Sequence, residues 1–147
     1  MTMNIRRILA MSFVPQGSDL GLLLLRVSVG LALFLKHGWE KPTAFTVMAA
    51  HFPDPLHIGA TPSLLFALVS DAICSLLIVL GLATRWSALI VFVNIFVAWS
   101  LVHHFEFLGN GADHGEICVL YLCACLCLFW TGGGRYSLDA SIASSAL

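Results

Sequence analysis

An acidic residue lies well inside an apolar stretch of the chain that is long enough to cross a bilayer. The stretch covers residues 63–82 and carries Asp71. An ionisable side chain at membrane depth is costly even on lenient insertion scales, so it normally has a partner and a role. At helical spacing Asp71 shares its face with small or weakly polar neighbours, namely Ala67, Leu68, Cys74 and Ser75. Such a face predicts contact with other helices rather than with lipid.

A cation and an amide reach a similar depth in neighbouring apolar stretches. Counted inward from the expected outer ends of their helices, Arg26, Asp71 and Asn94 lie within about one turn of each other at about 1.5 Å per residue. We therefore predict that Arg26 pairs with Asp71. The candidate buried polar layer consists of Arg26, Asp71, Asn94 and Glu116. It serves either as a structural ion pair that fixes helix register or as a proton or quinone site.

The cysteines suggest a second kind of chemistry. Cys74 and Cys127 each lie eleven residues inward from the expected outer ends of their helices, so the two thiols are candidates to face each other and exchange electrons with a quinone. No pair of cysteines has CxxC or zinc-knuckle spacing. The alternative is that these cysteines are small hydrophobic residues of a core.

Histidines gather near the expected outer ends of the helices and suggest a third possibility, a Zn or Cu(II) site. Imidazole and carboxylate groups are good ligands for both metals. The candidate ligands are His37, His103, His104, His114 and Glu116. Adjacent residues on a helix point about 100° apart, so at most one of His103 and His104 joins a given site. The alternative is that these histidines solvate helix ends, and the sequence favours it over a metal cofactor.

The composition excludes several classes of function. The 147 residues are 59% hydrophobic and only 10% charged, with a net charge of −1, and the mean hydropathy is +0.94. Soluble domains are about 25% charged, so the chain is predicted to reside in the lipid bilayer. No basic stripe is present for nucleic acid, and no phosphate-binding glycine loop or Ser/His/Asp layout occurs.

Four apolar stretches are candidates for the elements that position these residues. They cover residues 20–37, 63–82, 86–103 and 116–130. Each is close to the lower end of the about 17–25 residues that a spanning helix needs. We predict an all-α fold, a transmembrane four-helix bundle. Its parts are an interfacial N-terminal segment at 1–18, a membrane domain at 19–140 and a C-terminal tail at 141–147.

The cations predict the orientation of this bundle. Arg6, Arg7, Arg85 and Arg135 fall on one side, and Lys36 and Lys41 fall on the other. The positive-inside rule then places both termini in the cytoplasm and the histidines on the outer side. The prediction is therefore a multi-pass protein of a bacterial cytoplasmic (inner) membrane.

With the helices placed, the chain resembles the DoxX family of small four-helix membrane proteins. The segments that carry the resemblance are Leu-Leu-Leu-Arg26-Val-Ser-Val-Gly30, then His37-Gly38 and Lys41, then Leu80-Gly-Leu-Ala-Thr-Arg85, then Gly115-Glu116 with Leu120-Tyr121-Leu122, and Gly132-Gly-Gly-Arg135-Tyr-Ser-Leu-Asp139. The last phrase is the most specific. The chain departs from the family in having Asp71 where Glu is more frequent and Gly133 where Pro is frequent.

The resemblance implies a broad range of functions. The family takes its name from a membrane subunit of a thiosulfate:quinone oxidoreductase, and other members are associated with oxidoreductase complexes, thiol stress or copper-related peptide systems. Our first hypothesis is a subunit that supports quinone- or thiol-linked redox chemistry, with quinone as the candidate cofactor. The second is a non-catalytic accessory or scaffold subunit bound to a larger membrane protein or complex, and the third is metal handling by the outer histidines. The residues do not decide whether the chain is itself an enzyme.

Overall fold

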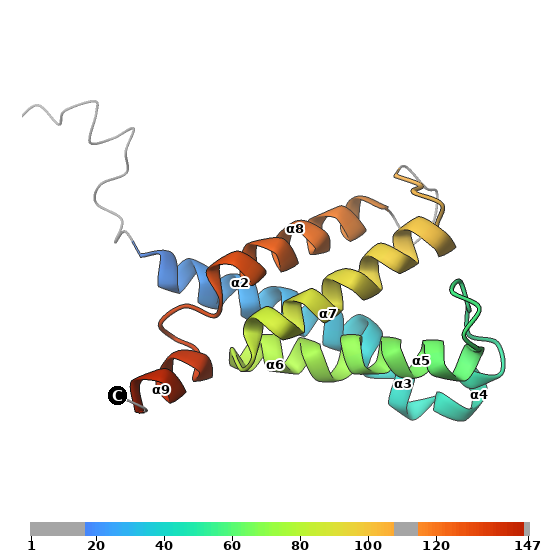
Figure 1. Ribbon diagram of the computed structural model, residues 1–147, viewed down its shortest axis with the longest axis horizontal. Helices are drawn as coiled ribbons and strands as arrows, with labels where there is room; N and C mark the ends of the chain where they lie inside the picture. Colours follow the sequence, from blue (N-terminus) through green and yellow to red (C-terminus); the bar gives the residue numbers. More distant parts are fainter. Residues whose placement is uncertain (1–16, 108–114, 146–147) are drawn as a thin grey trace, which may run out of the picture.

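The computed structural model describes residues 17–107 and 115–145, and every regular element in these two ranges is helical (Figure 1). The all-α prediction is therefore confirmed. Three helices are long and apolar enough to cross a membrane: Ser18–Thr43, Ala60–Leu80 and Thr84–Val102. A fourth apolar helix, α8 (Gly115–Thr131), has 17 residues. A short helix, α9 (Leu138–Ser145), follows it.

Each of the three long helices contains a π-helical turn. The first divides into α2 (Ser18–Leu33), η1 (Phe34–Gly38) and α3 (Glu40–Thr43). The second divides into α5 (Ala60–Leu68), η2 (Val69–Cys74) and α6 (Ser75–Leu80). The third divides into α7 (Thr84–Val97) and η3 (Ala98–Val102). Turns of this kind are rare and occur often at functional sites.

Several predicted boundaries need correction. The first helix does not end at His37 but continues through η1 and α3 to Thr43, and α4 (Phe45–Ala49) follows. The second begins at Ala60 rather than at residue 63. Part of the predicted tail at 141–147 is helical, because α9 extends to Ser145. Residues 1–16 of the predicted interfacial segment, with Arg6 and Arg7, lie outside the described residues.

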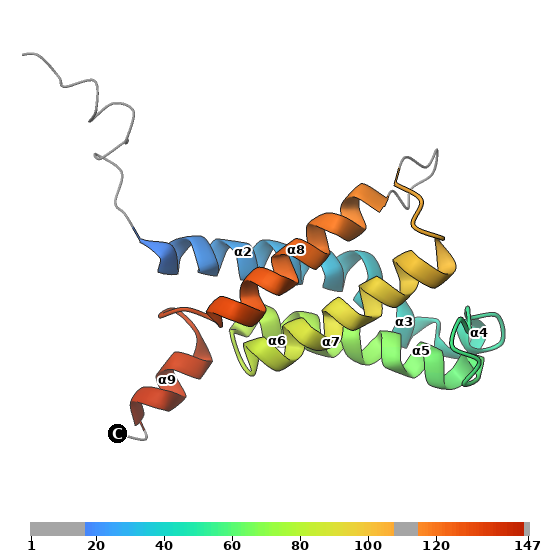
Figure 2. The same ribbon diagram turned by 45° about the horizontal axis from the view of Figure 1, so that its top comes forward.

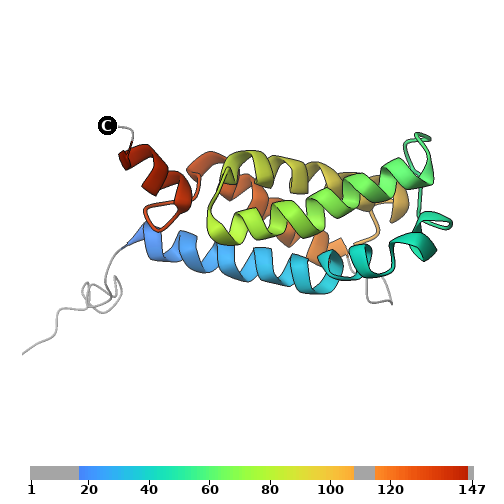
Figure 3. The same ribbon diagram turned by 90° about the horizontal axis from the view of Figure 1, so that it is seen from below.

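The helices pack side by side with two distinguishable ends (Figures 1 and 3). α2 packs along α6, and α8 packs along α7. We call the end with the tight turn between α6 and α7 the hairpin end; α9 lies there as well (Figure 2). We call the opposite end, where α3 and α4 lie, the pocket end. The core between these helices includes Leu33, Ile78, Val91, Leu122 and Leu128.

Two glycines fix the register between the first and second helices. A Cβ at Gly30 would come within 2.6 Å of the Ser75 carbonyl, and a Cβ at Gly38 would overlap the backbone of Asp71. Gly30 thus permits a close approach of the first helix to the second. Gly38 brings the first helix against η2 at the level of Asp71.

Candidate functional site

Asp71 pairs with Lys41, not with Arg26. The Lys41 ammonium lies 2.8 Å from Oδ2 of Asp71, and both side chains are buried, with exposed fractions of 9% and 8%. Lys41 Nζ also donates a hydrogen bond of 2.8 Å to the carbonyl of His37. Burying either charge alone would cost free energy, and pairing the ammonium with the carboxylate offsets that cost for both groups.

The carboxylate of Asp71 has further donors on its second oxygen. Asn94 Nδ2 donates to Oδ1 at 3.0 Å, and the Ser70 hydroxyl donates to the same atom at 3.1 Å. The structure therefore brings Asp71 and Asn94 together, as the depth count predicted. Four elements contribute to the resulting cluster. Lys41 lies in α3, the His37 carbonyl in η1, and Asn94 in α7. Asp71 and Ser70 both lie in η2.

The predicted Arg26–Asp71 pair is wrong because the depth count ended the first helix too early. Gly30 lies at the level of Ser75 and Val79, and Gly38 at the level of Asp71. Arg26 therefore meets the last turn of α6, about 10 Å further along that helix at about 1.5 Å per residue. The residue that reaches Asp71 has to lie close to Gly38 in sequence, and Lys41 does.

Arg26 instead fastens the hairpin end. It is completely buried, and its guanidinium donates to the carbonyls of Ile78 (3.3 Å), Val79 (3.0 Å) and Tyr136 (2.6 Å). The first two carbonyls lie at the carboxyl end of α6, where a cation is favoured by the helix dipole. Tyr136 belongs to the segment that leads into α9.

Asp139 completes this fastening from the other side. Its carboxylate accepts hydrogen bonds from the backbone N–H groups of Ala83 (2.7 Å) and Thr84 (2.9 Å) and from the Thr84 hydroxyl (2.8 Å). Burial of Asp139 raises its pKa, but these hydrogen bonds and the nearby Arg26 outweigh that effect, so the pKa lies below its ordinary value. We call Arg26, Thr84, Tyr136 and Asp139 the hairpin clamp. The terminal Arg-Tyr-Ser-Leu-Asp139 phrase thus has a structural role at the hairpin end.

The other predicted members of the polar layer and the thiol pair are placed apart. Glu116 is exposed at the start of α8 and does not belong to the buried layer. Cys127 is exposed too, whereas Cys74 is buried in the core, where Cys125 of α8 joins the same cluster. The predicted Cys74–Cys127 pairing is therefore not formed. Cys125, which lies on the core face of α8, comes two residues before the predicted Cys127.

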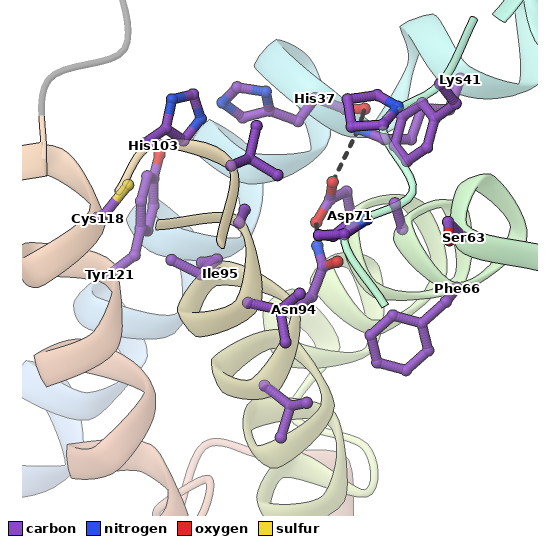
Figure 4. Close-up of a pocket in the computed structure, with 18 of the residues that line it drawn as sticks. His37, Lys41, Ser63, Phe66, Asp71, Asn94, Ile95, His103, Cys118 and Tyr121 are labelled. Carbon is purple, nitrogen blue, oxygen red and sulfur yellow. Dashed lines mark hydrogen bonds and ion pairs between the residues drawn. The ribbon is translucent and has the colours of Figure 1, made fainter. Parts of the chain in front are cut away.

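A pocket of about 770 Å³ lies around the Lys41–Asp71 pair (Figure 4). Its wall is mainly apolar, as is usual for sites that bind small molecules. The polar or ionisable side chains that line it are Lys36, His37, Lys41, Ser63, Asp71, Asn94, His103, Cys118 and Tyr121. In Figure 4, Asp71 lies between Lys41 and Asn94, with His37, His103 and Tyr121 on one side and Phe66 on the other.

The segment between α4 and α5 contributes to the wall at the pocket end. Phe52, Pro55, Leu56 and Ile58 all line the pocket. Asp54 holds this segment in place by accepting hydrogen bonds from the backbone of Ile58 (3.0 Å) and Gly59 (2.7 Å) and from the Ser63 hydroxyl (2.8 Å). Residues 52–58 are called the roof segment below.

The histidines divide between the pocket and the surface. His37 and His103 line the pocket. His104 is exposed and has a positive φ of 48°, and His114 lies outside the described residues. Within residues 17–107 and 115–145, no three His, Cys, Asp or Glu side chains lie close enough together to hold a metal ion.

Sequence reasoning missed Lys41 as a site residue. Lys41 lies between Gly38 and Pro42, two residues that usually end a helix, so the local sequence predicts an outer cation in a loop. The available signal was the spacing of Gly38 and Lys41, which places a lysine just beyond a close helix contact.

The fold and the pocket define a class of protein: an all-helical membrane protein with candidate spans and a pocket built around a buried ion pair. Within that class the chain belongs to the DoxX family, whose model matches residues 21–104. That match includes Arg26, Lys41, Asp71 and Asn94. The chain is also 32% identical over 130 residues to an uncharacterised protein of Haemophilus influenzae, covering 86% of this chain and 85% of that protein. No solved structure matches the chain.

Proposed function

We propose that this protein is a multi-pass subunit of a bacterial inner membrane that binds a quinone head group in the pocket and supports quinone-linked redox chemistry. The observation that carries the proposal is the buried Lys41–Asp71 pair, joined to Asn94, in the wall of a mainly apolar pocket of about 770 Å³. Membership of the DoxX family supports the same direction. The proposal includes α8 as a fourth span, since its 17 residues meet the lower limit of about 17.

The chemistry of a quinone fits the donors that line the pocket. An ammonium has three N–H donors, and the contacts with Asp71 and the His37 carbonyl use two of them. The third is available to a quinone carbonyl oxygen. When a quinone accepts electrons, negative charge develops on that oxygen, and a nearby fixed cation stabilises it in surroundings from which water is excluded.

The source of the electrons is proposed to be a partner. Cys74 and Cys125 are buried in the core and Cys127 is exposed, so the predicted Cys74–Cys127 pair is not formed and a second membrane protein or complex would supply the electrons. The accessory-subunit hypothesis therefore becomes part of this proposal, with the chain as the subunit that holds the quinone. The pocket end is proposed to face outward and the hairpin end, with Arg85 and Arg135, to face the cytoplasm.

A binding measurement tests the proposal. Purified protein in nanodiscs is titrated with decylubiquinone, and quenching of tryptophan fluorescence reports occupancy, because Trp99 lies in η3 beside the pocket-lining Ala98. The test variant is Lys41→Gln combined with Asp71→Asn, which removes both charges without leaving either one buried alone. The control is Arg135→Gln, an exposed cation at the hairpin end.

We expect the double variant to bind at least tenfold more weakly and Arg135→Gln to bind like the wild type. Equal affinity of the double variant and the wild type would overturn the quinone assignment. Copurification with a larger complex, with no binding in the isolated chain, would leave only the accessory role.

A further inference from the structure

We infer that the pocket continues sideways into a groove between α5 and α7 that holds the apolar tail of a membrane-dissolved quinone. We call Phe66, Val93 and Val97 the tail groove. All three line the same pocket as Lys41 and Asp71. The inference deepens the proposed function and rests on it, because the tail groove is useful only to a ligand whose head occupies the polar part of the pocket.

The groove arises because the second and third helices separate toward the pocket end. α7 packs against both α6 and η2. Beyond η2, α5 and the second half of α7 diverge, which the two views in Figures 1 and 2 both show. The Asn94–Asp71 hydrogen bond of 3.0 Å closes the narrow end of this wedge. The Asp71–Asn94 pair therefore lies at the narrow end, and Phe66 and Val97 lie along the sides, nearer the pocket end.

The sides of the wedge are exposed on the surface that a bilayer would cover. Phe66 is 41% exposed and Val93 is 42% exposed, although both line the pocket. We place the mouth of the pocket at these two side chains, because they line it and are partly exposed on spanning helices. This mouth opens laterally, toward the hydrocarbon region, and the roof segment lines the pocket at the end where α5 begins.

The position of the mouth determines the class of ligand. A water-soluble molecule would enter from the aqueous side, whereas a molecule already dissolved in the bilayer reaches the wedge by lateral diffusion. Its tail needs no transfer through water, so the groove selects for shape and contact rather than for hydrophobicity. A head with carbonyl oxygens and one long apolar tail matches the order of polar and apolar side chains along the wedge.

The test fills the groove without touching the polar cluster. Val93→Trp places a large side chain in the groove, and Phe96→Trp is the matched control, because Phe96 lies on the same helix, is 44% exposed and does not line the pocket. Both substitutions lie on an exposed surface of α7, so both variants are expected to fold. Each is titrated in nanodiscs with an isoprenoid-tailed ubiquinone and with the tailless 2,3-dimethoxy-5-methylbenzoquinone, at matched mole fractions in the bilayer.

We expect Val93→Trp to weaken binding of the tailed quinone at least tenfold and to change binding of the tailless quinone less than twofold, with Phe96→Trp unchanged for both. Equal effects of Val93→Trp on the two quinones, or no effect on the tailed one, would overturn the tail groove. The Lys41→Gln, Asp71→Asn double variant is titrated in parallel. Loss of both quinones in that variant supports the head site, whereas retention of both overturns the proposed function itself.

A crosslinking experiment locates the tail directly. An ubiquinone analogue with a diazirine on its tail is photolysed in nanodiscs, and the labelled peptides are identified by mass spectrometry. The inference predicts labelling concentrated on the α5 and α7 peptides and displaced by excess unmodified quinone. Undisplaced labelling spread equally over exposed apolar residues such as Leu24 and Leu120 would contradict it.

Discussion

At the scale of residues, the buried cluster shows how a membrane protein accommodates opposite charges. Lys41 and Asp71 are each buried, and each has the other within 2.8 Å. Asn94 and Ser70 satisfy the remaining carboxylate oxygen. The arrangement stabilises the fold and also keeps a cation in the wall of the pocket, so both roles suggested for the polar layer are compatible with this cluster of four side chains.

The first prediction concerns this pair. Lys41→Gln or Asp71→Asn alone leaves the opposite charge buried without its ionic partner, so each single variant should lose about 3–5 kcal/mol of unfolding free energy. The double variant should lie within about 1 kcal/mol of the wild type, because both charges are gone. Thermal denaturation in detergent measures all four proteins. Equal destabilisation by the double variant and by the sum of the singles would show that the two charges do not interact.

The second prediction concerns Arg26. Lysine keeps the charge but lacks the planar fork that reaches the carbonyls of Val79 and Tyr136 at once. Arg26→Lys should therefore cost about 1–3 kcal/mol of stability, while the proposed quinone binding at the pocket end stays unchanged. A loss of quinone affinity in a variant with wild-type stability would show that Arg26 acts in the pocket instead of the hairpin clamp.

At the scale of elements, the hairpin clamp joins three segments that are distant in sequence. Arg26 of α2 contacts the end of α6 and the segment before α9, and Asp139 of α9 caps the start of α7. The backbone N–H of Asp139 also donates to the carbonyl of Gly81 at 2.9 Å. The clamp therefore holds the tight α6–α7 turn from both sides, which leaves the opposite halves of these helices to separate.

The third prediction concerns Asp139. Removing its carboxylate in Asp139→Ala leaves the first N–H groups of α7 without their cap, which should cost about 1 kcal/mol. Because hydrogen bonds lower the pKa of Asp139 in the folded protein, its contribution is fully present above the unfolded pKa of about 3.9 and disappears as the pH falls through the folded pKa.

The difference in melting temperature between the wild type and Asp139→Ala should accordingly be largest near neutral pH and shrink below about pH 4. Glu40→Ala is the control, since Glu40 is exposed at the pocket end. A difference that stays constant from pH 7 to pH 3 would mean that the charge of Asp139 is irrelevant to the cap.

The extent to which the sequence predicts the fold and the candidate site differs from element to element. Most of the predicted face of Asp71 is confirmed: Ala67, Cys74 and Ser75 are buried and Leu68 is half-buried. Phe66 and Ile73, on other faces of the same helix, are exposed. That face follows from helical periodicity, which is a local property. The Lys41 partner was missed because it depends on a helix that continues past glycine and through a π-helical turn, and neither leaves a periodic signal.

The contacts of the hairpin clamp also could not be predicted from local sequence patterns. Asp139 lies 55 residues from Thr84, and Arg26 lies 110 residues from Tyr136. A contact at that separation is determined by how the helices pack, although the terminal phrase that carries it was recognisable as a family feature. The core position of Cys125 likewise depends on how α8 is rotated about its axis. Because α8 is apolar on all sides, its sequence does not indicate which side faces the core.

At the scale of the whole molecule, the surface agrees with a bilayer environment. Large apolar side chains on all the long helices point outward, among them Leu24, Leu35, Leu65 and Leu120. Trp86 and Trp130 are about 70% exposed at the hairpin end, and Trp39 is 62% exposed at the other. Tryptophan at both ends of an apolar belt is typical of membrane proteins, since its ring favours the interface.

The fourth prediction concerns orientation. With Arg85 and Arg135 at the hairpin end, a green fluorescent protein fused to the C-terminus should fluoresce, and an alkaline phosphatase fused there should be inactive. The reverse is expected for fusions made after Ala49, at the end of α4. An active phosphatase at the C-terminus would place the pocket end in the cytoplasm and invert the proposed orientation.

The π-helical turns bear on how the pocket can change between related proteins. A π-helical turn corresponds to one residue more than a regular α-helix would use over the same length. Deleting a single residue from η2 would therefore restore a regular helix and leave α5 and α6 facing nearly the same way as before, because the π-helical turn only takes up the extra residue. The Arg26 contacts with α6 would stay as they are. A one-codon deletion at η2 would therefore change the side chains within that turn, Asp71 among them, while both flanking helices and the hairpin clamp keep their structure.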